Sequence, residues 1–258
     1  MTLLDGAALA VFFLCWVGYA AVTDRVPAIQ RRSVIAAMDE HRRRWMLALL
    51  SRENRISDTA IIGNLMASTS FLANTAIFIL GGLVALMAAP ELGQRVVAAL
   101  PLAAPPSSVA AWEARIALLL LIFIRAFFEL TWALRQFNYC SILVGGIGHG
   151  PECIPQAETA ARVANRAARH FNTGLRAYYF GLAALAWIIH PVALMAASLA
   201  VLWELHRREF RSAVRQSLID GGAGDAAPAD ARLPASGGST AAGPRSAAKE
   251  AGTPAPHG

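Results

Sequence analysis

The stretch "ARIALLLLIFIRAFFELTWALRQFNYCSILVGGIGHG", Ala114–Gly150, decides the fold class. Its first half is an apolar run long enough to cross the ~30 Å hydrocarbon layer of a membrane as a helix. Arg125 and Glu129 nevertheless lie inside this run, and Arg135 and Asn138 follow it closely. The stretch therefore predicts a membrane helix whose ionisable groups need partners, because a charge in hydrocarbon is costly and is a candidate for function.

The rest of the chain has the same character. Of its 258 residues, 56% are hydrophobic and only 16% are charged, and the apolar residues form long blocks, which is not typical of a soluble domain. We predict an all-α integral membrane protein with four transmembrane helices, at residues 3–22, 58–89, 114–137 and 178–205, in one membrane domain over residues 1–215. Residues 216–258 are rich in Ala, Gly and Pro, so we expect a disordered tail.

Arginine dominates the basic residues, with 22 Arg against one Lys. Eight arginines lie in residues 23–57: Arg25, Arg31, Arg32, Arg42, Arg43, Arg44, Arg52 and Arg55. By the positive-inside rule this loop is cytoplasmic and the N-terminus lies outside, as expected of a multi-pass protein of the inner (cytoplasmic) membrane. A membrane surface explains the positive charge more simply than nucleic acid, so no nucleic-acid partner is predicted.

The basic loop contains a predicted amphipathic helix with Ser33 as its N-cap. We expect this helix either to lie in the lipid headgroup layer or to pack on the bundle, and Arg42, Arg43 and Arg44 to contact anionic lipid headgroups. A second basic cytoplasmic helix is predicted after Pro155, with an arginine stripe on one side. Residues 90–113 contain four prolines and are predicted to form an irregular external loop.

The fourth apolar block conflicts with this topology. Four crossings that start outside end outside, yet residues 206–215 carry four arginines. Pro191 lacks an N–H and predicts a kink, and a broken or re-entrant fourth block would return the tail to the cytoplasm. The side of the C-terminus thus stays open. We expect His190 to bond a backbone carbonyl that the kink sets free.

The second block contains polar residues in two rows. Gly63, Ala67, Ser70, Asn74 and Gly81 form a row of small residues that favours packing against another helix. Asn64 begins a neighbouring polar row, which serves either packing or the lining of a wet cavity.

Arg125 and Glu129 are four residues apart, so they share a helical face and can pair. Such a pair either fixes which helices meet or lines a polar cavity for an ion or small solute. We expect Arg135 to extend to lipid phosphates at the cytoplasmic surface. The cysteines and histidines match no metal-binding pattern, and no nucleophile stands at a recognisable spacing from a base. No catalytic residue, metal or cofactor is therefore predicted.

Three stretches carry a family resemblance: "RENRISDTAIIGNLMASTSFLANTAIFILGGL" (Arg52–Leu83), "LRQFNYCSILVGG" (Leu134–Gly146) and "FNTGLRAYYFGLAALAWIIHP" (Phe171–Pro191). The chain resembles, over roughly residues 5–215, the bacterial and plant membrane proteins grouped as domain of unknown function 599 (DUF599). The resemblance implies a four-helix membrane protein and supplies no activity. It adds emphasis to Arg176, which lies in the third stretch.

Three functions stay open at this point. The first is a non-enzymatic membrane scaffold or lipid-associated helical bundle, with the bilayer and anionic headgroups as partners. The alternative is a small channel or transporter that uses the polar face of the third helix, and such a protein would need to form a homo-oligomer because four helices enclose little space. The second alternative is a membrane-embedded lipid-modifying enzyme.

Overall fold

The computed structural model describes residues 2–30, 33–99, 108–211, 213 and 216–218, and every regular element in these ranges is helical. The predicted all-α class is thus confirmed. The predicted disordered tail falls almost entirely on residues outside these ranges. Three helical segments are long and apolar enough to cross a membrane: Leu3–Arg25, Ile56–Ala88 and Val109–Gly146. They agree with the first three predicted spans and are typical of a multi-pass membrane protein.

The first segment is one rod. It consists of α1 (Leu3–Phe13), a π-helical stretch (Leu14–Gly18) and α2 (Tyr19–Arg25). Thr2 begins it through a capping box, in which its side chain accepts from the Asp5 N–H while the Asp5 carboxylate accepts from the Thr2 N–H. The rod has 23 residues, or about 35 Å, enough to cross hydrocarbon with a short projection.

The basic loop that follows is helical and packs on the protein. It contains α3 (Pro27–Gln30), α4 (Val34–Ala48) and a 3₁₀ turn (Leu49–Ser51). Ser33 caps α4 as predicted, with its side chain accepting from the Ala36 N–H. α4 packs against α8, and the side chains of Met46 and Leu49 are completely buried. This helix was expected either to lie in the headgroup layer or to pack on the bundle. Its Met46 side packs on the bundle.

The helix of the second apolar block agrees with its predicted bounds to within two residues, whereas that of the third extends well beyond them at both ends. α5 (Ile56–Ala88) and α7 (Val109–Gly146) have 33 and 38 residues, so both exceed the hydrocarbon thickness. The expectation of an irregular loop after α5 is wrong in part, because α6 (Pro90–Ala98) forms there. Pro90 occupies the first turn, where its missing N–H costs nothing. Gly93 of α6 lies against the Trp112 ring, which leaves no room for a β-carbon.

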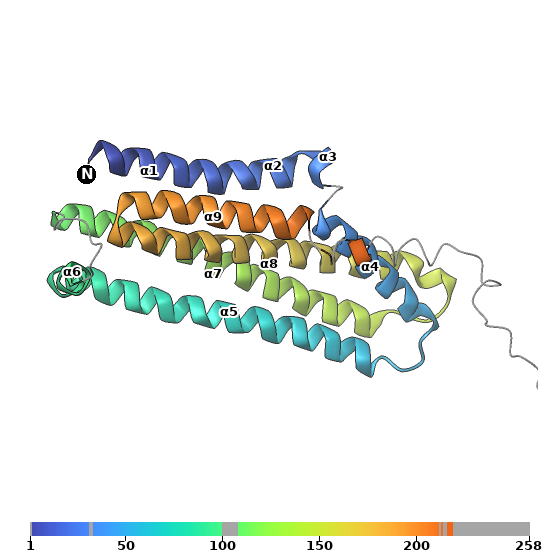
Figure 1. The fold of residues 1–258 in the computed structure, drawn as a ribbon. Helices are drawn as coiled ribbons and strands as arrows, with labels where there is room; N and C mark the ends of the chain where they lie inside the picture. Colours follow the sequence, from blue (N-terminus) through green and yellow to red (C-terminus); the bar gives the residue numbers. More distant parts are fainter. Residues whose placement is uncertain (1, 31–32, 100–107, 212, 214–215, 219–258) are drawn as a thin grey trace, which may run out of the picture.

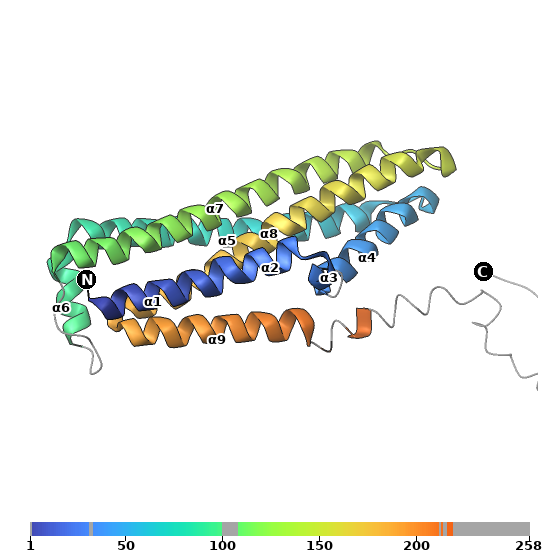
Figure 2. The ribbon, with the colours of Figure 1, turned by 90° about the horizontal axis from the view of Figure 1, so that it is seen from above.

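The fourth block is two helices and not one. After a 3₁₀ turn (Pro151–Cys153), α8 runs from Ile154 to Ile189 and α9 from Pro191 to Phe210. His190 between them is fully extended, with φ −159° and ψ 142°. The chain reverses at this residue, so α9 returns antiparallel to α8 and packs beside it (Figures 1 and 2). The predicted fourth span over 178–205 is therefore interrupted at Pro191, and of the kinked and the broken block that the sequence left open, the broken one describes the structure.

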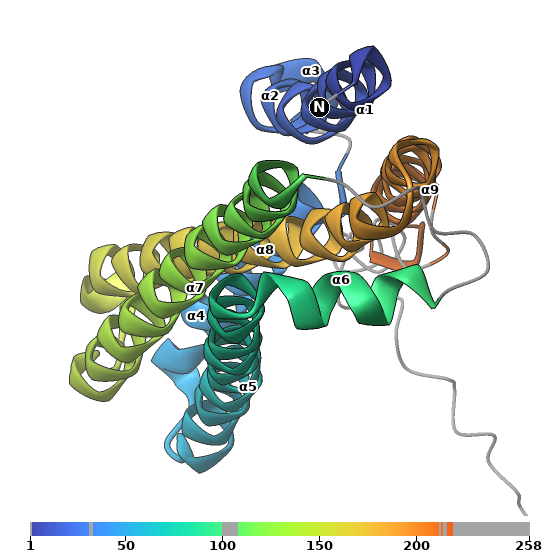
Figure 3. The ribbon, with the colours of Figure 1, turned by 90° about the vertical axis from the view of Figure 1, so that its left-hand side faces the viewer.

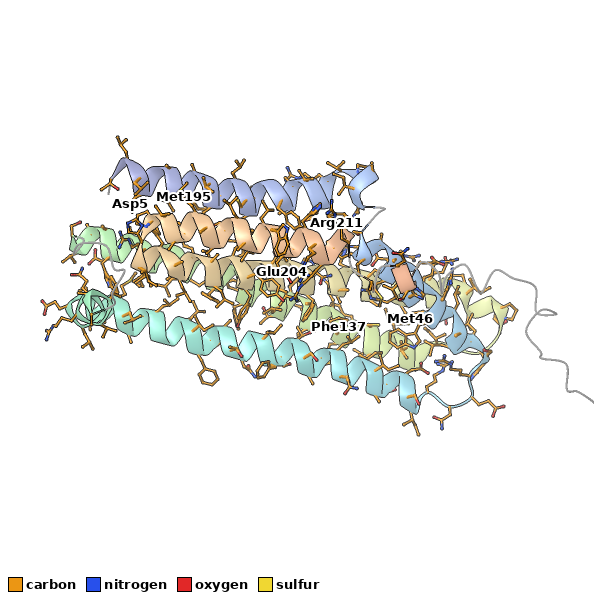
Figure 4. The ribbon with its side chains drawn as sticks, viewed as in Figure 1. Asp5, Met46, Phe137, Met195, Glu204 and Arg211 are labelled. Atoms are coloured by element: carbon orange, nitrogen blue, oxygen red, sulfur yellow. The ribbon has the colours of Figure 1, made fainter. Side chains whose placement is uncertain are left out.

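The long helices form a series of neighbours. α5 packs on α7, α7 on α8, α8 on α9, and α9 on α1, as the end-on view in Figure 3 also shows. One end of the bundle, here called the Asp5 end, holds Asp5, α6 and the His190–Pro191 turn. The opposite end, here called the arginine-rich end, holds α3, α4 and the end of α9 (Figures 1 and 4).

The buried apolar residues form two separate clusters. The larger lies between the long helices and includes Phe12, Leu119, Phe123, Phe180 and Trp187. The smaller lies at the arginine-rich end, where Met46 of α4 and Leu49 of the 3₁₀ turn meet the last turns of α7 and the alanine-rich start of α8. The protein thus has a second core at this end, separate from the one between the long helices.

The α7–α8 pair forms the centre of the bundle because small residues let the two helices approach closely. A β-carbon at Gly174 would lie 2.8 Å from the Leu130 side chain, and one at Gly181 would lie 2.9 Å from the Phe123 ring. Close approach at small residues is typical of helix pairs in membranes.

Candidate functional site

Glu129 is the centre of the polar cluster in α7. Its carboxylate lies 3.1 Å from the Arg125 guanidinium, one turn earlier, as the spacing predicted. The other carboxylate oxygen lies 2.8 Å from Nδ1 of His170 in α8. The antiparallel α8 therefore supplies a partner that the spacing within α7 did not reveal. Arg125, Glu129 and His170 form one chain of polar contacts across two helices.

A shallow cavity of about 430 Å³, here called the lateral cavity, opens beside this cluster. Trp132 lines it, with its ring 6.5 Å from the His170 ring at 79°. Apolar side chains of α7 form the rest of its wall: Leu121, Ile124 and Phe128. The Glu129 side chain is 18% exposed and that of Arg125 is 55% exposed. The carboxylate is thus held by protein, while the guanidinium faces the surroundings.

The depth of the cluster follows from the helix geometry. Arg115 of α7 approaches Asp5 in the first turn of the first rod, at 3.5 Å. Glu129 is fourteen residues further along α7, which is about 21 Å of helix. In a ~30 Å hydrocarbon layer that begins near Arg115, Glu129 would lie in the half nearer the arginine-rich end. Its double pairing fits such a position, because an unpaired carboxylate there would be costly.

His170 was not predicted as a site residue. In the sequence it lies between Arg169 and Phe171, in the helix that was predicted to carry an arginine stripe. Its partner Glu129 lies 41 residues earlier in the chain. Only the register between α7 and α8 brings the two together, and a single sequence contains no direct signal for that register.

On the other side of α8 lies a deeper hollow of about 500 Å³, here called the polar groove. α2, α3, the start of α4, α8 and the end of α9 line it, and His170 contributes to both hollows. Its lining residues are Tyr19, Thr23, Asp24, Gln30, Ser33, Ile35, Arg166, Arg169, His170, Asn172, Leu175, Arg176, Tyr179, Leu205, Arg208 and Glu209. The groove is therefore rich in hydrogen-bond donors at the arginine-rich end of the bundle.

Arg176, a predicted site residue, ties α8 to α2 in this groove. One guanidinium nitrogen donates to the Thr23 hydroxyl at 2.8 Å, and another lies 2.8 and 2.9 Å from the two oxygens of Asp24. Glu209 of α9 accepts from the Ile35 N–H at 3.4 Å. Burial raises the pKa of the Glu209 carboxyl above its usual value, because the charged form loses hydration.

The predicted lipid-facing arginines have protein partners. Arg42 pairs with Asp39 at 2.7 Å and donates to the Asn165 amide at 3.0 Å, and burial lowers the pKa of its guanidinium. Arg43 lies 3.4 Å from Glu158 of α8, and Arg44 lies 3.2 Å from Glu40. Arg42 is thus used inside the protein, whereas Arg43 and Arg44 keep exposed surface beside their ion pairs.

Several other predicted residues lie apart from the cluster. Arg135 donates to the Tyr139 hydroxyl at 2.6 Å and stands over the rings of Trp132 and Tyr139. Asn138 is exposed on the same stretch of α7. Asn64 and Asn74 are exposed on α5, and neither side chain hydrogen-bonds a described residue. Most of the small-residue row of α5 is therefore left uncovered by the described part of the chain.

His190 has a role different from the one expected. Its Nδ1 accepts a hydrogen bond from the Val192 N–H at 3.1 Å and so caps α9. The expectation of a bond to a freed carbonyl is wrong, because the chain reversal leaves donors, not acceptors, at the start of the new helix.

Two further clusters of hydrogen-bonded polar side chains were not predicted from the sequence. At the Asp5 end, Asp5 accepts from the Trp187 Nε1–H at 2.9 Å, and Arg115 stacks over the Trp187 ring. At the opposite end, the buried Asp58 accepts from the Trp45 Nε1–H and from Arg52. Nearby, Arg55 donates to the carbonyl of residue 144 in the last turn of α7 and to those of residues 147 and 148 just after it. These contacts join the rod, α4 and the loops to the bundle.

The described residues contain no group of three or more His, Cys, Asp or Glu side chains placed to hold a metal ion. Cys140 and Cys153 are both buried, and each donates to a backbone carbonyl. The arrangement of the polar cluster can hold and orient a proton between carboxylate and imidazole, while the groove can offer donors to an anion.

Comparison with known proteins bears on the family only. None of the curated proteins and none of the solved structures compared with the chain matches it. The family model described as "Protein of unknown function, DUF599" matches residues 7–214, which include the long helices except for the first four residues of the rod. Because this match covers most of the 258 residues, the chain belongs to the DUF599 family.

Proposed function

We propose that the protein is a non-enzymatic helical bundle of the inner membrane that associates with anionic lipid through its arginine-rich end. One observation carries this proposal. Arginines of α2, α4, the first half of α8 and the end of α9 gather at one end of the bundle, whereas Arg95 and Arg115 stand at the other among the described residues. Such asymmetry fits a protein whose basic end meets an anionic cytoplasmic leaflet.

The proposed topology has five crossings, not four. The rod Leu3–Arg25, α5 and α7 are three of them. The second part of α8 (171–189) and α9 (about 191–205) supply two more, because they lie beside the other spans and share their core. With the N-terminus outside, five crossings leave the basic segment after α9 in the cytoplasm, which agrees with the positive-inside rule.

The lipid association is tested on the full-length protein purified in detergent. Phosphatidylglycerol or phosphatidylcholine is added in matched amounts, and the thermal unfolding midpoint is recorded at low and high salt. We expect phosphatidylglycerol alone to raise the midpoint, and the increase to shrink at high salt because exposed charges are screened. Equal effects of the two lipids would contradict the proposal.

We also propose that α5 associates with a second copy of the chain. Only 17% of the most apolar 18-residue stretch of α5 is buried, against 39% for that of α7. A β-carbon at Gly63 or Gly81 would meet open space. On the same face the Asn74 amide makes no hydrogen bond to a described residue, and hydrocarbon cannot supply one. A second copy of the chain inserts into the membrane with the same orientation. Its own Asn74 amide therefore lies at the same depth and can pair with the first.

This association is tested by counting subunits in native membranes or lipid discs. Asn74→Leu removes the amide, so we expect it to shift the dimer toward monomer, whereas Leu92→Ala, at an exposed apolar side chain of α6 away from this row, should leave the dimer unchanged. A monomeric wild-type protein, or identical behaviour of the two variants, would contradict the self-association without affecting the proposed lipid association.

A second candidate function, transport of an ion or small solute, is supported by one observation. The Arg125–Glu129–His170 chain of contacts opens on the lateral cavity at membrane depth, and intramembrane carboxylate–imidazole pairs are typical of proton or ion pathways. If the protein transports, Glu129→Gln in liposomes should change ion or solute flux relative to wild type, while Glu91→Gln on α6 should not. Equal flux in all three proteins would remove this candidate.

A further inference from the structure

Five polar side chains with unused hydrogen-bonding capacity converge on the polar groove. They are the Arg166 guanidinium, the hydroxyls of Tyr19 and Tyr179, the Asn172 amide, and Nε2 of His170. None of these groups hydrogen-bonds a described residue, while all five line the same hollow. All five side chains are at least partly accessible, so a ligand that enters the hollow can reach them, and a lining in which donors predominate suits a ligand that accepts hydrogen bonds.

The charge balance of the groove also favours an anion. Three of its four arginines are paired: Arg169 with Asp39 at 2.9 Å, Arg176 with Asp24, and Arg208 with Glu204 at 2.6 Å. Arg166 is the fourth and has no carboxylate partner among the described residues. Glu209 could offset it, but burial raises the pKa of that carboxyl and so favours its neutral form.

The position of the groove selects a ligand with both polar and apolar parts. Tyr19 lies six residues before the end of the membrane rod at Arg25. On the N-terminal side of Tyr19, residues 6–18 of the rod are continuously apolar. Leu175, Leu205 and Ile35 add apolar wall beside the donors. Tyrosines at such a position are typical of the membrane–water interface, where lipid phosphates lie.

From this geometry we infer that the polar groove is a specific site for the phosphate-bearing headgroup of an anionic phospholipid. Arg166 supplies the unpaired charge, and the hydroxyls of Tyr19 and Tyr179 together with the Asn172 amide supply neutral hydrogen bonds. The lipid chains continue along the apolar wall toward the hydrocarbon. This inference rests on the proposed lipid association and assigns it to one site.

The test uses the full-length, delipidated protein and measures lipid binding by native mass spectrometry. The ligands are dioleoyl phosphatidylglycerol, dioleoyl phosphatidylcholine, glycerol 3-phosphate and inorganic phosphate. The key variant is Arg166→Ala, which removes no hydrogen bond or ion pair to a described residue and should leave the fold intact, because the side chain is exposed. The matched control is Arg162→Ala, one turn earlier on α8, which removes the same charge from an exposed side chain outside the groove.

We expect tight binding of phosphatidylglycerol alone, and about a tenfold loss of its affinity in Arg166→Ala, since a charge-assisted hydrogen bond is lost. Arg162→Ala should bind as wild type. Tyr179→Phe, which keeps the ring, should also weaken binding and provides a second measurement if Arg166→Ala is unstable.

The remaining outcomes overturn distinct parts of the inference. Equal losses in Arg166→Ala and Arg162→Ala would mean diffuse attraction to the basic end and would overturn the site while leaving the lipid association. Equal affinity for glycerol 3-phosphate or inorganic phosphate would overturn the lipid as the source of the phosphate. No preference for phosphatidylglycerol over phosphatidylcholine in wild type would overturn both the site and the proposed function.

Discussion

At the scale of single residues, two glycines of α8 set the distance between the central helices. Gly174 faces Leu130 of α7, and Gly181 faces Phe123, each at a separation that leaves no room for a β-carbon. The two glycines are seven residues apart, so they lie on the same face of α8 and act together. The large buried cluster depends on this approach, because Phe123 and Phe180 belong to it.

Gly181→Leu should destabilise the bundle, because the added side chain would overlap the Phe123 ring. Overpacking of this kind costs about 1–3 kcal/mol, which a lowered unfolding midpoint in detergent would report. The matched control is Gly82→Leu on α5, where a β-carbon meets nothing within 4 Å. If Gly181→Leu unfolded at the same temperature as Gly82→Leu, the close α7–α8 approach would be incorrect.

Glu209 gives a prediction about pH. Burial raises the pKa of its carboxyl in the folded protein, so folding favours the protonated form. Its contribution to stability is therefore complete below the ordinary glutamate pKa and falls as the pH rises through the elevated folded value. Glu209→Gln stays neutral, so it should be more stable than wild type at pH 7 and should lose this advantage in acid. Parallel pH profiles of the two proteins would show that Glu209 is not buried.

The sequence predicted contacts within a helix better than contacts between helices. The Arg125–Glu129 pair followed from a spacing of four residues, and the structure has it at 3.1 Å. His170, Trp187 and Asp58 were missed because their partners lie on other elements. The periodicity of a helix shows which residues share a face, but it does not show which face of another helix they meet.

At the scale of elements, the reversal at His190–Pro191 determines the architecture. Pro191 opens α9 in the first turn, where its ring is tolerated, and the extended His190 caps that helix through its own side chain. The sequence indicated a disturbance at this dipeptide but not its size, because proline alone is compatible with a kink as well as a break. The packing of α9 on α8 and α1 favours the break.

Substitutions at His190 test this cap. His190→Ala removes the side-chain acceptor for the Val192 N–H, which should lower stability by about 1 kcal/mol. His190→Asn restores an acceptor at a position where Asn is a preferred cap, so it should unfold near the wild-type temperature. Both are compared by thermal unfolding in the same detergent, and equal stability of all three proteins would argue against a cap at this residue.

At the scale of the whole molecule, the bundle has an apolar middle and two unlike ends. The predicted helical class and the first three spans agree with the structure, because long apolar blocks are strong signals in one dimension. The second core at the arginine-rich end was not predicted, since its alanines and the buried Met46 carry no pattern that separates them from a solvated helix. The polar groove was also missed, because its walls come from segments far apart in the chain.

The central claim is that the chain crosses the membrane five times, so that the basic loop at 23–57 and the basic segment at 206–215 both lie in the cytoplasm. The most direct measurement is a topology map of the full-length protein, with compartment-sensitive reporters fused before residue 1 and after residue 215. We predict an N-terminal reporter that is active only outside and a C-terminal reporter that is active only in the cytoplasm. Both reporters on the outer side would mean four crossings and would contradict the folded-back α9.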